Sequence, residues 1–458
     1  MVSSWKVTWE NFRGYQNPTE FEFPKITLLI GRNNVGKTSA YAPLLLLKQT
    51  LDAKDRRTNL LTRGSLLDAG TFKEIVYGHD SDRSLRFKMD LGLGDLRVRG
   101  RDSRPITDAS LDISFDARED GLSCALTKTI MSDRSGNNIV KRIKNTKKDS
   151  WRVSAPVLPP RSSGGRPIRE ISDFSRALNE EMPHGFLFSG LGAIYMPSKW
   201  RKDEQRWEAA RPWMDAVFDL YDIQSSFNHT FENRLRNISY LGPLRSLPSR
   251  TYRISPEVPS DVGRDGQFAP ELLMRSDNGD VKRSVNRWLS TLGYGDLDFR
   301  QLGDDFFQVL VRSSRDGIEV NLSHTGIGLS QLLPILVQGS LTRDGDTFIV
   351  QQPEIHLNPA QQCIITDFLV DRAVGGTRTI VETHSEHLVL RLRRRIAEGV
   401  ISAQDVAVYY CDNINDVSTA ERISIGERAE LNIQDWPSGF FEEQLEDSFA
   451  LALAQAGR

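Results

Sequence analysis

Hydrophobic and polar positions alternate at the start of the chain. Trp5, Val7 and Trp9 alternate with polar neighbours, which is the period of a half-buried strand. A second apolar run, Ile26–Ile30, leads directly into a glycine-bounded loop, and a helical pattern follows through Leu47. Strand, loop and helix in this order predict a nucleotide-binding α/β core.

The pattern changes over the middle of the chain. Residues 84–116 have the spacing of short strands separated by polar turns, and residues 168–182 and about 200–237 have helical spacing. Lys and Arg are concentrated in residues 134–169, where Pro159-Pro160 and nearby Ser and Gly residues predict that much of the segment is loop. We interpret this middle part as a mixed α+β insertion into the core.

Apolar strand patterns resume in the last part of the chain. Strands are predicted at residues 347–350, 379–381 and 406–410. No long heptad tract occurs, so no long coiled coil is expected. We therefore predict an α/β protein in three parts: an N-terminal lobe at 1–80, an insertion at 81–237 and a C-terminal lobe at 238–458.

Composition narrows the class of protein. Lys and Arg total 59 and Asp and Glu total 61, which gives a formal net charge of −2 and excludes a chain that is basic throughout. The hydrophobic share of 39% and the charged share of 26% are ordinary for a globular protein. The apolar runs are far shorter than the roughly 20 residues of a membrane span. We expect a cytoplasmic protein that makes no membrane contact.

The loop after the second strand carries the strongest motif. Residues 31–38, Gly-Arg-Asn-Asn-Val-Gly-Lys-Thr, match GxxxxGK[ST], in which backbone amides surround phosphate groups. Lys37 would reach the β- and γ-phosphates, and the Thr38 hydroxyl would bind Mg²⁺. A simple glycine turn is the alternative, and Lys37-Thr38 in register argues against it. We predict ATP and Mg²⁺ as cofactors, with nucleotide contacts from Gly31, Asn33, Asn34, Gly36, Lys37, Thr38 and Ser39.

A second motif, residues 347–359, is an apolar strand that ends in Gln-Gln-Pro-Glu-Ile-His-Leu-Asn-Pro. With the opening Asn11–Tyr15, it resembles the ABC-type AAA family ATPases of the RecF, SMC and OLD branch. The resemblance implies an ABC-ATPase head, a P-loop core with a mixed sheet and helices. In that family the strand commonly ends in Asp-Glu, whereas Gln351 and Gln352 stand at these positions here.

This departure changes the expected chemistry. An amide binds Mg²⁺ less strongly than a carboxylate does and cannot act as a base. We retain Gln351 with Thr38 as the predicted metal residues and predict Glu354 as the catalytic base. Two outcomes stay open, slow hydrolysis through Glu354 or an ATP-bound clamp that hydrolyses little. A structural role for Glu354, capping the loop that follows, is a third.

The resemblance also assigns two further residues to the nucleotide. His384, in Thr-His-Ser after the strand at 379–381, stands at the switch position that senses the γ-phosphate. A capping histidine is the alternative. Arg13 resembles a family arginine that approaches the phosphates, and a surface arginine is the alternative.

In this family, two copies sandwich two ATP molecules, each bound by one phosphate loop and the partner's signature turn. The corresponding segment here is Leu322–Leu336, where a glycine-rich turn precedes an apolar helix. Gly328 matches a family glycine, and Gly326 stands where a serine is usual. Thr325 or Ser330 would supply a hydroxyl in its place. We predict contacts from Gly326, Gly328 and Ser330, while a plain helix N-terminus remains the alternative.

A closer resemblance covers Tyr240–Arg245, Val262–Gly266 and Trp436–Phe441. These segments are similar to stand-alone prokaryotic ATPases, such as the ATPase subunits of the PARIS or Septu antiviral systems. We therefore expect a sensor or scaffold of a prokaryotic defence complex that binds ATP and hydrolyses it slowly. Expected partners are a second copy or a higher homo-oligomer, and a separate effector protein, a nuclease or similar. The alternative is a RecF-like DNA-binding clamp that uses the basic stretch 134–169.

Overall fold

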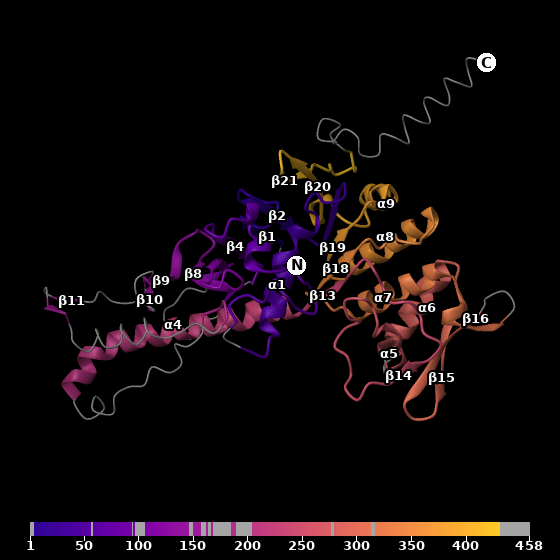
Figure 1. Ribbon diagram of the computed structural model, residues 1–458, viewed down its shortest axis with the longest axis horizontal. Helices are drawn as coiled ribbons and strands as arrows, with labels where there is room; N and C mark the ends of the chain where they lie inside the picture. The colour runs from indigo at the N-terminus through magenta and orange to yellow at the C-terminus, as the bar shows by residue number, and fades with distance from the viewer. Residues whose placement is uncertain are drawn as a thin grey trace, which may run out of the picture. The chain divides into compact units, whose positions relative to one another are not determined.

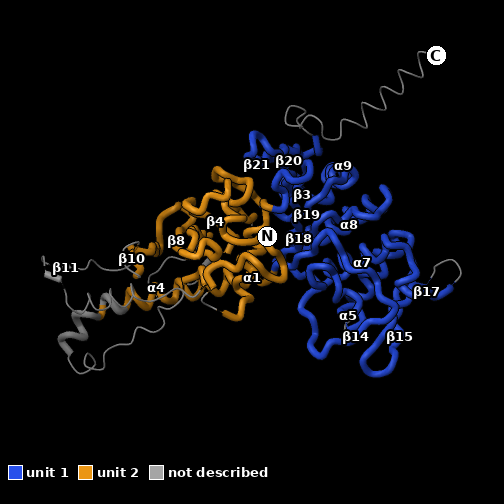
Figure 2. The backbone as a smooth tube through the Cα atoms, viewed as in Figure 1, with its two compact units in different colours: residues 1–2, 23–38, 238–458 blue, residues 3–22, 39–237 orange. Residues whose placement is uncertain are grey.

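The computed structural model describes residues 4–430 except 56–57, 94, 97–105, 146–149, 157–161, 164–165, 168–184, 189–203, 276–278 and 313–316. The chain forms two compact units (Figure 2). Unit 1 comprises Met1–Val2, Phe23–Thr38 and Ile238–Arg458, and unit 2 comprises Ser3–Glu22 and Ser39–Asn237. The three-part division predicted from the sequence stays a prediction.

Unit 1 is built on a six-stranded mixed sheet in the order β13-β18-β19-β3-β20-β21 (Figure 1). The first five strands are parallel, and β21 runs antiparallel to β20 at the edge. The strands are β3 (Ile26–Gly31), β13 (Ile238–Leu241), β18 (Thr347–Gln351), β19 (Arg378–Glu382), β20 (Val406–Ile414) and β21 (Val417–Ile423). Because parallel strands end at the same edge of a sheet, the loops after β3, β18 and β19 lie side by side.

Helices of unit 1 cover this sheet. α7 packs against β13 and β18, and α8 packs against β19 and β3. The helices are α5 (Ala269–Met274), α6 (Asp280–Thr291), α7 (Ile327–Leu341), α8 (Pro359–Val374) and α9 (Glu386–Ala397). The apolar strands are buried throughout, as in β18 and β19, which agrees with a parallel sheet covered by helices.

A smaller antiparallel sheet of unit 1 precedes α7. Its strands are β14 (Tyr252–Arg253), β15 (Asp296–Leu302), β16 (Phe306–Arg312) and β17 (Glu319–Asn321), with β16 pairing with the other three. Short 3₁₀ turns follow at η5 (Leu322–His324) and, before β20, at η6 (Ala403–Asp405). The glycine turn Thr325-Gly326 therefore joins η5 to α7.

Unit 2 contains a seven-stranded sheet in the order β10-β9-β8-β7-β4-β1-β2. Its strands are β1 (Trp5–Glu10), β2 (Thr19–Phe23), β4 (Leu85–Asp90), β7 (Ser110–Ala117), β8 (Cys124–Ser132), β9 (Asn138–Lys144) and β10 (Trp151–Ser154). The predicted alternation of β1 is confirmed, since Trp5, Val7 and Trp9 are buried. Trp9 packs edge-on against Phe87 of β4, with ring centroids 5.4 Å apart.

The remaining elements of unit 2 are mainly helical. They are α1 (Ala42–Leu51), α2 (Phe72–Ile75), η2 (Tyr77–His79), α4 (Glu204–Arg236) and the short pairs β5 (Asp95–Leu96) with β6 (Ile106–Thr107) and β11 (Ser162–Ser163) with β12 (Arg166–Pro167). The predicted helix at 200–237 is confirmed by α4. The predicted helix at 168–182 lies outside the described residues.

Two local predictions require correction. The predicted loop does not extend over β9 and β10 of the basic stretch, and Pro159-Pro160, on which this prediction was based, lies outside the described residues. In addition, the helical pattern after the phosphate loop does not begin at once. A 3₁₀ turn, η1 (Thr38–Ala40), comes first, and α1 starts at Ala42. Pro43 lies in the first turn of α1, where a missing N–H is tolerated.

The fold class expected from the sequence is confirmed. The described residues form an α/β protein with a mixed sheet, and no long coiled coil occurs among them. Over the same residues, no helix has both the length and the apolar character needed to cross a membrane.

Candidate functional site

The phosphate loop follows β3 at the carboxyl edge of the unit 1 sheet. Gly31 ends β3 with φ +137°, and a methyl group at this position would overlap the carbonyl oxygen of Cys411 on β20. Only glycine therefore allows the loop to leave the sheet here. Asn33 and Asn34 are exposed at the loop tip, and Gly36 has a φ of +102°. The loop is thus shaped by backbone requirements that the motif's glycines meet.

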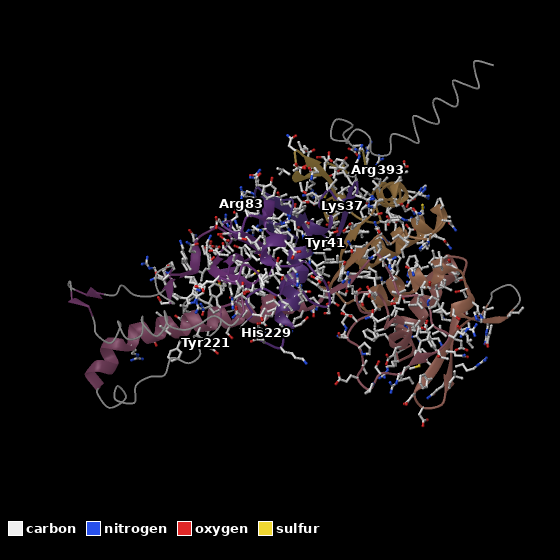
Figure 3. The ribbon with its side chains drawn as sticks, viewed as in Figure 1. Lys37, Tyr41, Arg83, Tyr221, His229 and Arg393 are labelled. Atoms are coloured by element: carbon white, nitrogen blue, oxygen red, sulfur yellow. The ribbon has the colours of Figure 1, made fainter. Side chains whose placement is uncertain are left out.

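Lys37, which is labelled in Figure 3, is folded against its own loop. Its side chain is only 4% exposed, and Nζ donates hydrogen bonds to the carbonyl oxygens of Gly31, at 3.0 Å, and Arg32. Burial lowers the pKa of Lys37, and the carboxylates of Glu382 and Glu354 counter this shift. The ammonium group thus lies inside the loop that matches the phosphate-binding motif.

Three polar side chains meet where β18 and β19 end. The Thr38 hydroxyl donates to Oε2 of Glu382 at 2.9 Å. The Gln351 amide nitrogen donates to the same Glu382 oxygen at 2.8 Å and to the Thr38 hydroxyl at 3.2 Å. The Gln351 oxygen accepts a 2.5 Å hydrogen bond from Tyr240 of β13. The predicted pair Thr38 and Gln351 is therefore adjacent, with the amide nitrogen of Gln351 facing Thr38.

Glu354 and His384 are also brought together. The backbone N–H of His384 donates to Oε1 of Glu354 at 2.8 Å, and Oε2 is buried without a hydrogen-bond partner in the described structure. Burial raises the pKa of Glu354, and hydrogen bonds from the His384 N–H and the Thr383 side chain, together with the Arg245 charge, counter this shift. A carboxylate with a raised pKa and one uncommitted oxygen has the properties of a general base.

The His384 imidazole is half-buried beside charged groups. Burial lowers its pKa, the Lys37 charge lowers it further, and Glu382 raises it. The ring is therefore neutral at physiological pH and can donate one hydrogen bond while accepting another. Ser385, the next residue, caps α9 by accepting a hydrogen bond from the backbone N–H of Leu388.

Three residues at the site carried no role in the sequence analysis: Glu382, Tyr240 and Arg245. Arg245 donates to the backbone oxygens of Gln351, at 2.5 Å, and Gln352, so it holds the turn after β18. Burial lowers the pKa of Arg245 to about 10. Tyr240 and Arg245 are the first and last residues of the segment Tyr240–Arg245, which resembles stand-alone prokaryotic ATPases. Glu382 could have been found from the sequence, because it is a charged residue directly after the uncharged strand residues Thr379–Val381.

The signature turn divides into exposed and buried parts. Gly326, at the start of α7, is exposed, and a side chain there would meet no atom within 4 Å. Gly328 is buried, and a methyl group there would lie 2.9 Å from the carbonyl oxygen of His356. The Ser330 hydroxyl is 5% exposed and donates to the Ile327 carbonyl at 2.7 Å. Gly328 and Ser330 thus have roles within this chain, whereas Gly326 faces outward.

Two predicted contacts belong to unit 2, Arg13 and Ser39. The Arg13 backbone N–H donates to Ile75 at 2.7 Å, and its guanidinium lies over the Phe12 ring, 5.6 Å from the centroid. Burial lowers the pKa of Arg13. Ser39 is buried within η1. Their assignment to the nucleotide stays a prediction.

The basic stretch is described only in part. Lys141, Arg142 and Lys144 lie on β9, and Arg152 lies on β10. Arg142 is 5% exposed, with its guanidinium 5.0 Å from the centroid of the Trp151 ring. It therefore packs within unit 2 and does not contribute to an outer basic face. A nucleic-acid surface here stays a prediction.

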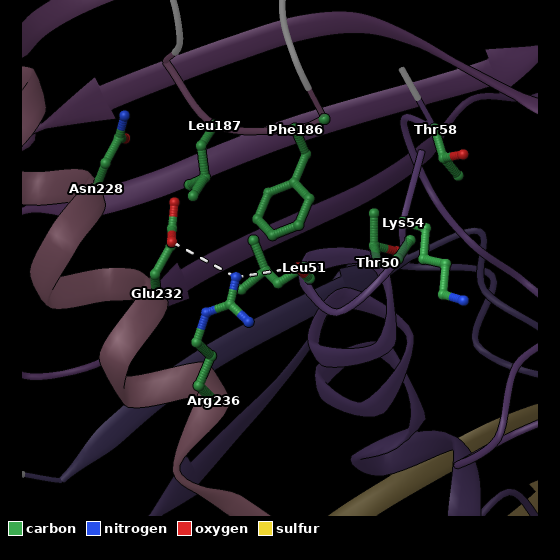
Figure 4. A pocket seen from close by; sticks show the side chains of 11 residues that line it. Thr50, Leu51, Lys54, Thr58, Phe186, Leu187, Asn228, Glu232 and Arg236 are labelled. Carbon is green, nitrogen blue, oxygen red and sulfur yellow. Dashed lines mark hydrogen bonds and ion pairs between the residues drawn. The ribbon is translucent and has the colours of Figure 1, made fainter. Parts of the chain in front are cut away.

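A separate pocket of about 510 Å³ lies within unit 2, between α1 and the end of α4 (Figure 4). Arg236 occupies one wall, where it pairs with Glu232 at 3.8 Å and donates to the Leu51 carbonyl at 3.0 Å. A second bond from Arg236 reaches Asp52 at 2.6 Å. These contacts connect α4 to α1, and we assign the wall a structural role.

The residues at the strand ends fit a magnesium ion carried by a nucleotide. Mg²⁺ takes oxygen ligands and is commonly held by one or two protein groups together with phosphates and water. The Thr38 hydroxyl and the Glu382 carboxylate are such oxygens, 2.9 Å apart. Among the described residues, no group of three or more His, Cys, Asp or Glu could hold a metal by itself. Phosphate oxygens would have to complete the coordination.

Two segments of the chain are similar to known families. Residues 5–150 match the family model described as AAA ATPase domain, which supports an AAA-type ATPase. Residues 401–451 match a family described as protein of unknown function (DUF3696). None of the curated proteins matches the chain.

Several solved structures are similar over most of the chain. The SMC head domain from Thermotoga maritima is 12% identical, with 92% of this chain and 99% of that chain covered and a TM-score of 0.38. An SMC head bound to the C-terminal winged-helix domain of ScpA is 12% identical, with 92% and 97% covered and a TM-score of 0.42. An SMC head from Pyrococcus furiosus, bound to the C-terminal domain of ScpA, is 12% identical, with 93% and 97% covered and a TM-score of 0.40.

Proposed function

We propose that this chain binds ATP with Mg²⁺ at the carboxyl edge of the unit 1 sheet and hydrolyses it slowly. The observation that carries the proposal is the meeting of Thr38, Glu354 and His384 at the ends of neighbouring parallel strands, next to a buried Lys37. The AAA ATPase match at residues 5–150 supports the same assignment. Lys37 would bind the β- and γ-phosphates, and Thr38 would hold the metal.

Glu354 would act as the base in hydrolysis. A water oxygen bonds to the γ-phosphorus while the bond from this phosphorus to the β,γ-bridging oxygen breaks, which yields ADP and phosphate. Oε2 of Glu354 takes the proton from the attacking water and later releases it to solvent. The bond from the His384 backbone to Oε1 leaves Oε2 available for this step. The Mg²⁺ ion, when bound, would neutralise negative charge on the phosphates.

Turnover of ATP by three forms of the protein tests this assignment. Lys37→Ala should bind no nucleotide. Glu354→Gln should bind ATP normally but hydrolyse it about 100-fold more slowly or worse, since a general base contributes roughly 10²–10⁴-fold. Equal turnover by the native protein and Glu354→Gln would refute the base assignment and leave the ATP-bound clamp.

We further propose that ATP joins two copies through the signature turn. The exposed Gly326 and the backbone amides at the start of α7 would face the partner's γ-phosphate. Leu247, which is 70% exposed and lines a small hollow with Ser330 and Leu333 of α7, would lie in the apolar part of this interface.

Light scattering tests the dimer. With Mg²⁺ and ATP, Glu354→Gln should change from a single chain of 51.8 kDa to about twice that mass. Leu247→Asp should prevent the change and keep ATP binding, whereas Leu390→Asp, at an exposed leucine of α9, should dimerise normally. A protein that binds ATP and remains a single chain would exclude the sandwich.

In the cell, we propose that the dimer serves as sensor or scaffold in a prokaryotic antiviral defence complex, with the effector on a separate protein. The support is the resemblance of Tyr240–Arg245 and Val262–Gly266 to stand-alone defence ATPases. Purification together with the products of neighbouring genes tests it. A chain that elutes alone with ATP and without it would count against this role.

A further inference from the structure

Glu382 occupies the position between the two nucleotide-binding strands. β19 lies between β18 and β3 in the sheet, and its last residue, Glu382, pairs in register with Gln351 of β18 and Leu29 of β3. A side chain at the end of β19 is therefore adjacent to both the phosphate loop and the strand that ends in Gln351. Thr38 is within hydrogen-bonding distance of Glu382, at 2.9 Å.

The chemistry expected at Gln351 is present at Glu382 instead. P-loop ATPases hold Mg²⁺ with the Ser or Thr of the loop and an acidic residue from a neighbouring strand. Gln351 cannot provide that charge, and its amide oxygen already accepts from Tyr240. The carboxylate that contacts Thr38 comes from the adjacent strand.

The two side chains are complementary. Gln351 donates to Glu382 at 2.8 Å, a distance at which two ionised carboxylates would repel each other strongly. With Gln at position 351 and Glu at position 382, the amide of one side chain donates a hydrogen bond to the carboxylate of the other. Two carboxylates at these positions could not make this bond. Glu382 is also 7% exposed, and the hydrogen bonds from Thr38 and Gln351 hold its carboxylate in this buried position.

We infer that Glu382 is the acidic residue of the magnesium site, replacing the carboxylate that β18 lacks, and that Gln351 orients it. This inference rests on the proposed ATP site and deepens it. Thr38 and Glu382 supply the protein oxygens and the nucleotide phosphates supply others, so the metal should bind tightly only when nucleotide is present.

Electron paramagnetic resonance of Mn²⁺, which has similar ligand preferences, tests the inference directly. Free Mn²⁺ is titrated with protein, with and without a non-hydrolysable ATP analogue. Native protein should bind Mn²⁺ tightly only with the analogue. Glu382→Gln should weaken this binding roughly 10- to 100-fold, while its affinity for the analogue in EDTA stays within about 2-fold of native.

Control variants separate charge from position. Glu421→Gln, at an exposed glutamate on β21, should behave like native protein. Glu382→Asp keeps the charge on a shorter side chain and should bind Mn²⁺ with an affinity between those of native protein and Glu382→Gln. The exchange Gln351→Asp with Glu382→Gln returns a carboxylate to β18 and should recover part of the metal affinity.

The outcomes are distinguishable. If Glu382→Gln and Glu382→Asp bind the analogue and titrate Mn²⁺ as native protein does, the inference is overturned and the proposed ATP site stands. If Gln351→Leu loses the metal while Glu382→Gln keeps it, the ligand is Gln351 and the inference is again overturned. If folded native protein binds no analogue in either buffer, the proposed function and the inference are both overturned.

Discussion

Individual side chains at the strand ends form a small charged network. Burial lowers the pKa of Lys37 and of His384, the charges of Glu382 and Glu354 raise that of Lys37, and the Lys37 charge lowers that of His384 further. Lys37 hydrogen-bonds to two carbonyl oxygens of its own loop, so the proposed phosphate contact would replace these bonds. These bonds hold the Lys37 ammonium group in the loop, where it could pair with an anion such as phosphate.

The protonation of His384 gives a test at the residue scale. Since burial and the Lys37 charge lower its pKa, His384 should gain its proton below the ordinary range near 6.5. Lys37→Ala should raise the pKa, because it removes a nearby positive charge and admits water. Histidine ring signals in an NMR pH titration, assigned with His384→Asn, give both values. A pKa at or above the ordinary value, or no change in Lys37→Ala, would contradict the described surroundings.

Elements meet at the signature turn, where two glycines have different roles. Gly328 allows the first turn of α7 to approach the loop after β18, since a methyl group there would crowd the His356 carbonyl and the Tyr294 hydroxyl. Gly326 precedes it on an exposed turn without such neighbours. Gly328 is therefore needed for close packing of α7, whereas Gly326 lies on the surface and has no such packing role.

Paired substitutions test this difference between the glycines. Gly328→Ala should lower the free energy of unfolding by about 1–3 kcal/mol, the usual cost of overpacking. Gly326→Ser should leave thermal stability within experimental scatter and provides the matched control. Thermal unfolding of the nucleotide-free protein measures both. Equal midpoints for the two variants would show that α7 does not approach the loop as described.

Some elements were predictable from the sequence, and others were not. The strands around the site follow from apolar runs such as Ile26–Ile30, which are confirmed by β3 and its neighbours. The phosphate loop follows from its motif. The late start of α1 at Ala42 was missed, because the helical pattern outweighed Pro43. The strand β9 was missed, because it lies in a stretch that was interpreted as loop from Pro159-Pro160 and nearby Ser and Gly residues.

The central carboxylate was harder to find than the strand that carries it. Glu382 and Gln351 are adjacent only because β19 pairs with β18, and pairing between distant segments leaves no local mark in the sequence. The same is true of Tyr240, which reaches Gln351 from β13. A missing acid at Gln351 and an extra acid at Glu382 are a paired signal that becomes clear once the strand order is known.

At the scale of the whole molecule, the site depends on contacts between distant parts of the sequence. The unit 1 sheet combines the segment Phe23–Thr38 with strands that follow Ile238. The chain between them forms most of unit 2, so the phosphate loop and its neighbouring strands come together only when unit 1 folds as one body. A measurement of nucleotide binding would therefore also test whether the strands of this sheet have assembled correctly.

Binding of ATP at the phosphate loop can be measured by equilibrium uptake of labelled ATP by folded protein, with Mg²⁺ and with EDTA. We expect one nucleotide per chain, tighter binding with Mg²⁺, and no uptake by Lys37→Ala. Lys282→Ala, which removes a lysine at an exposed ion pair with Asp298, should bind as native protein does. Absence of uptake by well-folded native protein, or equal uptake by Lys37→Ala, would show that the loop at residues 31–38 does not bind ATP.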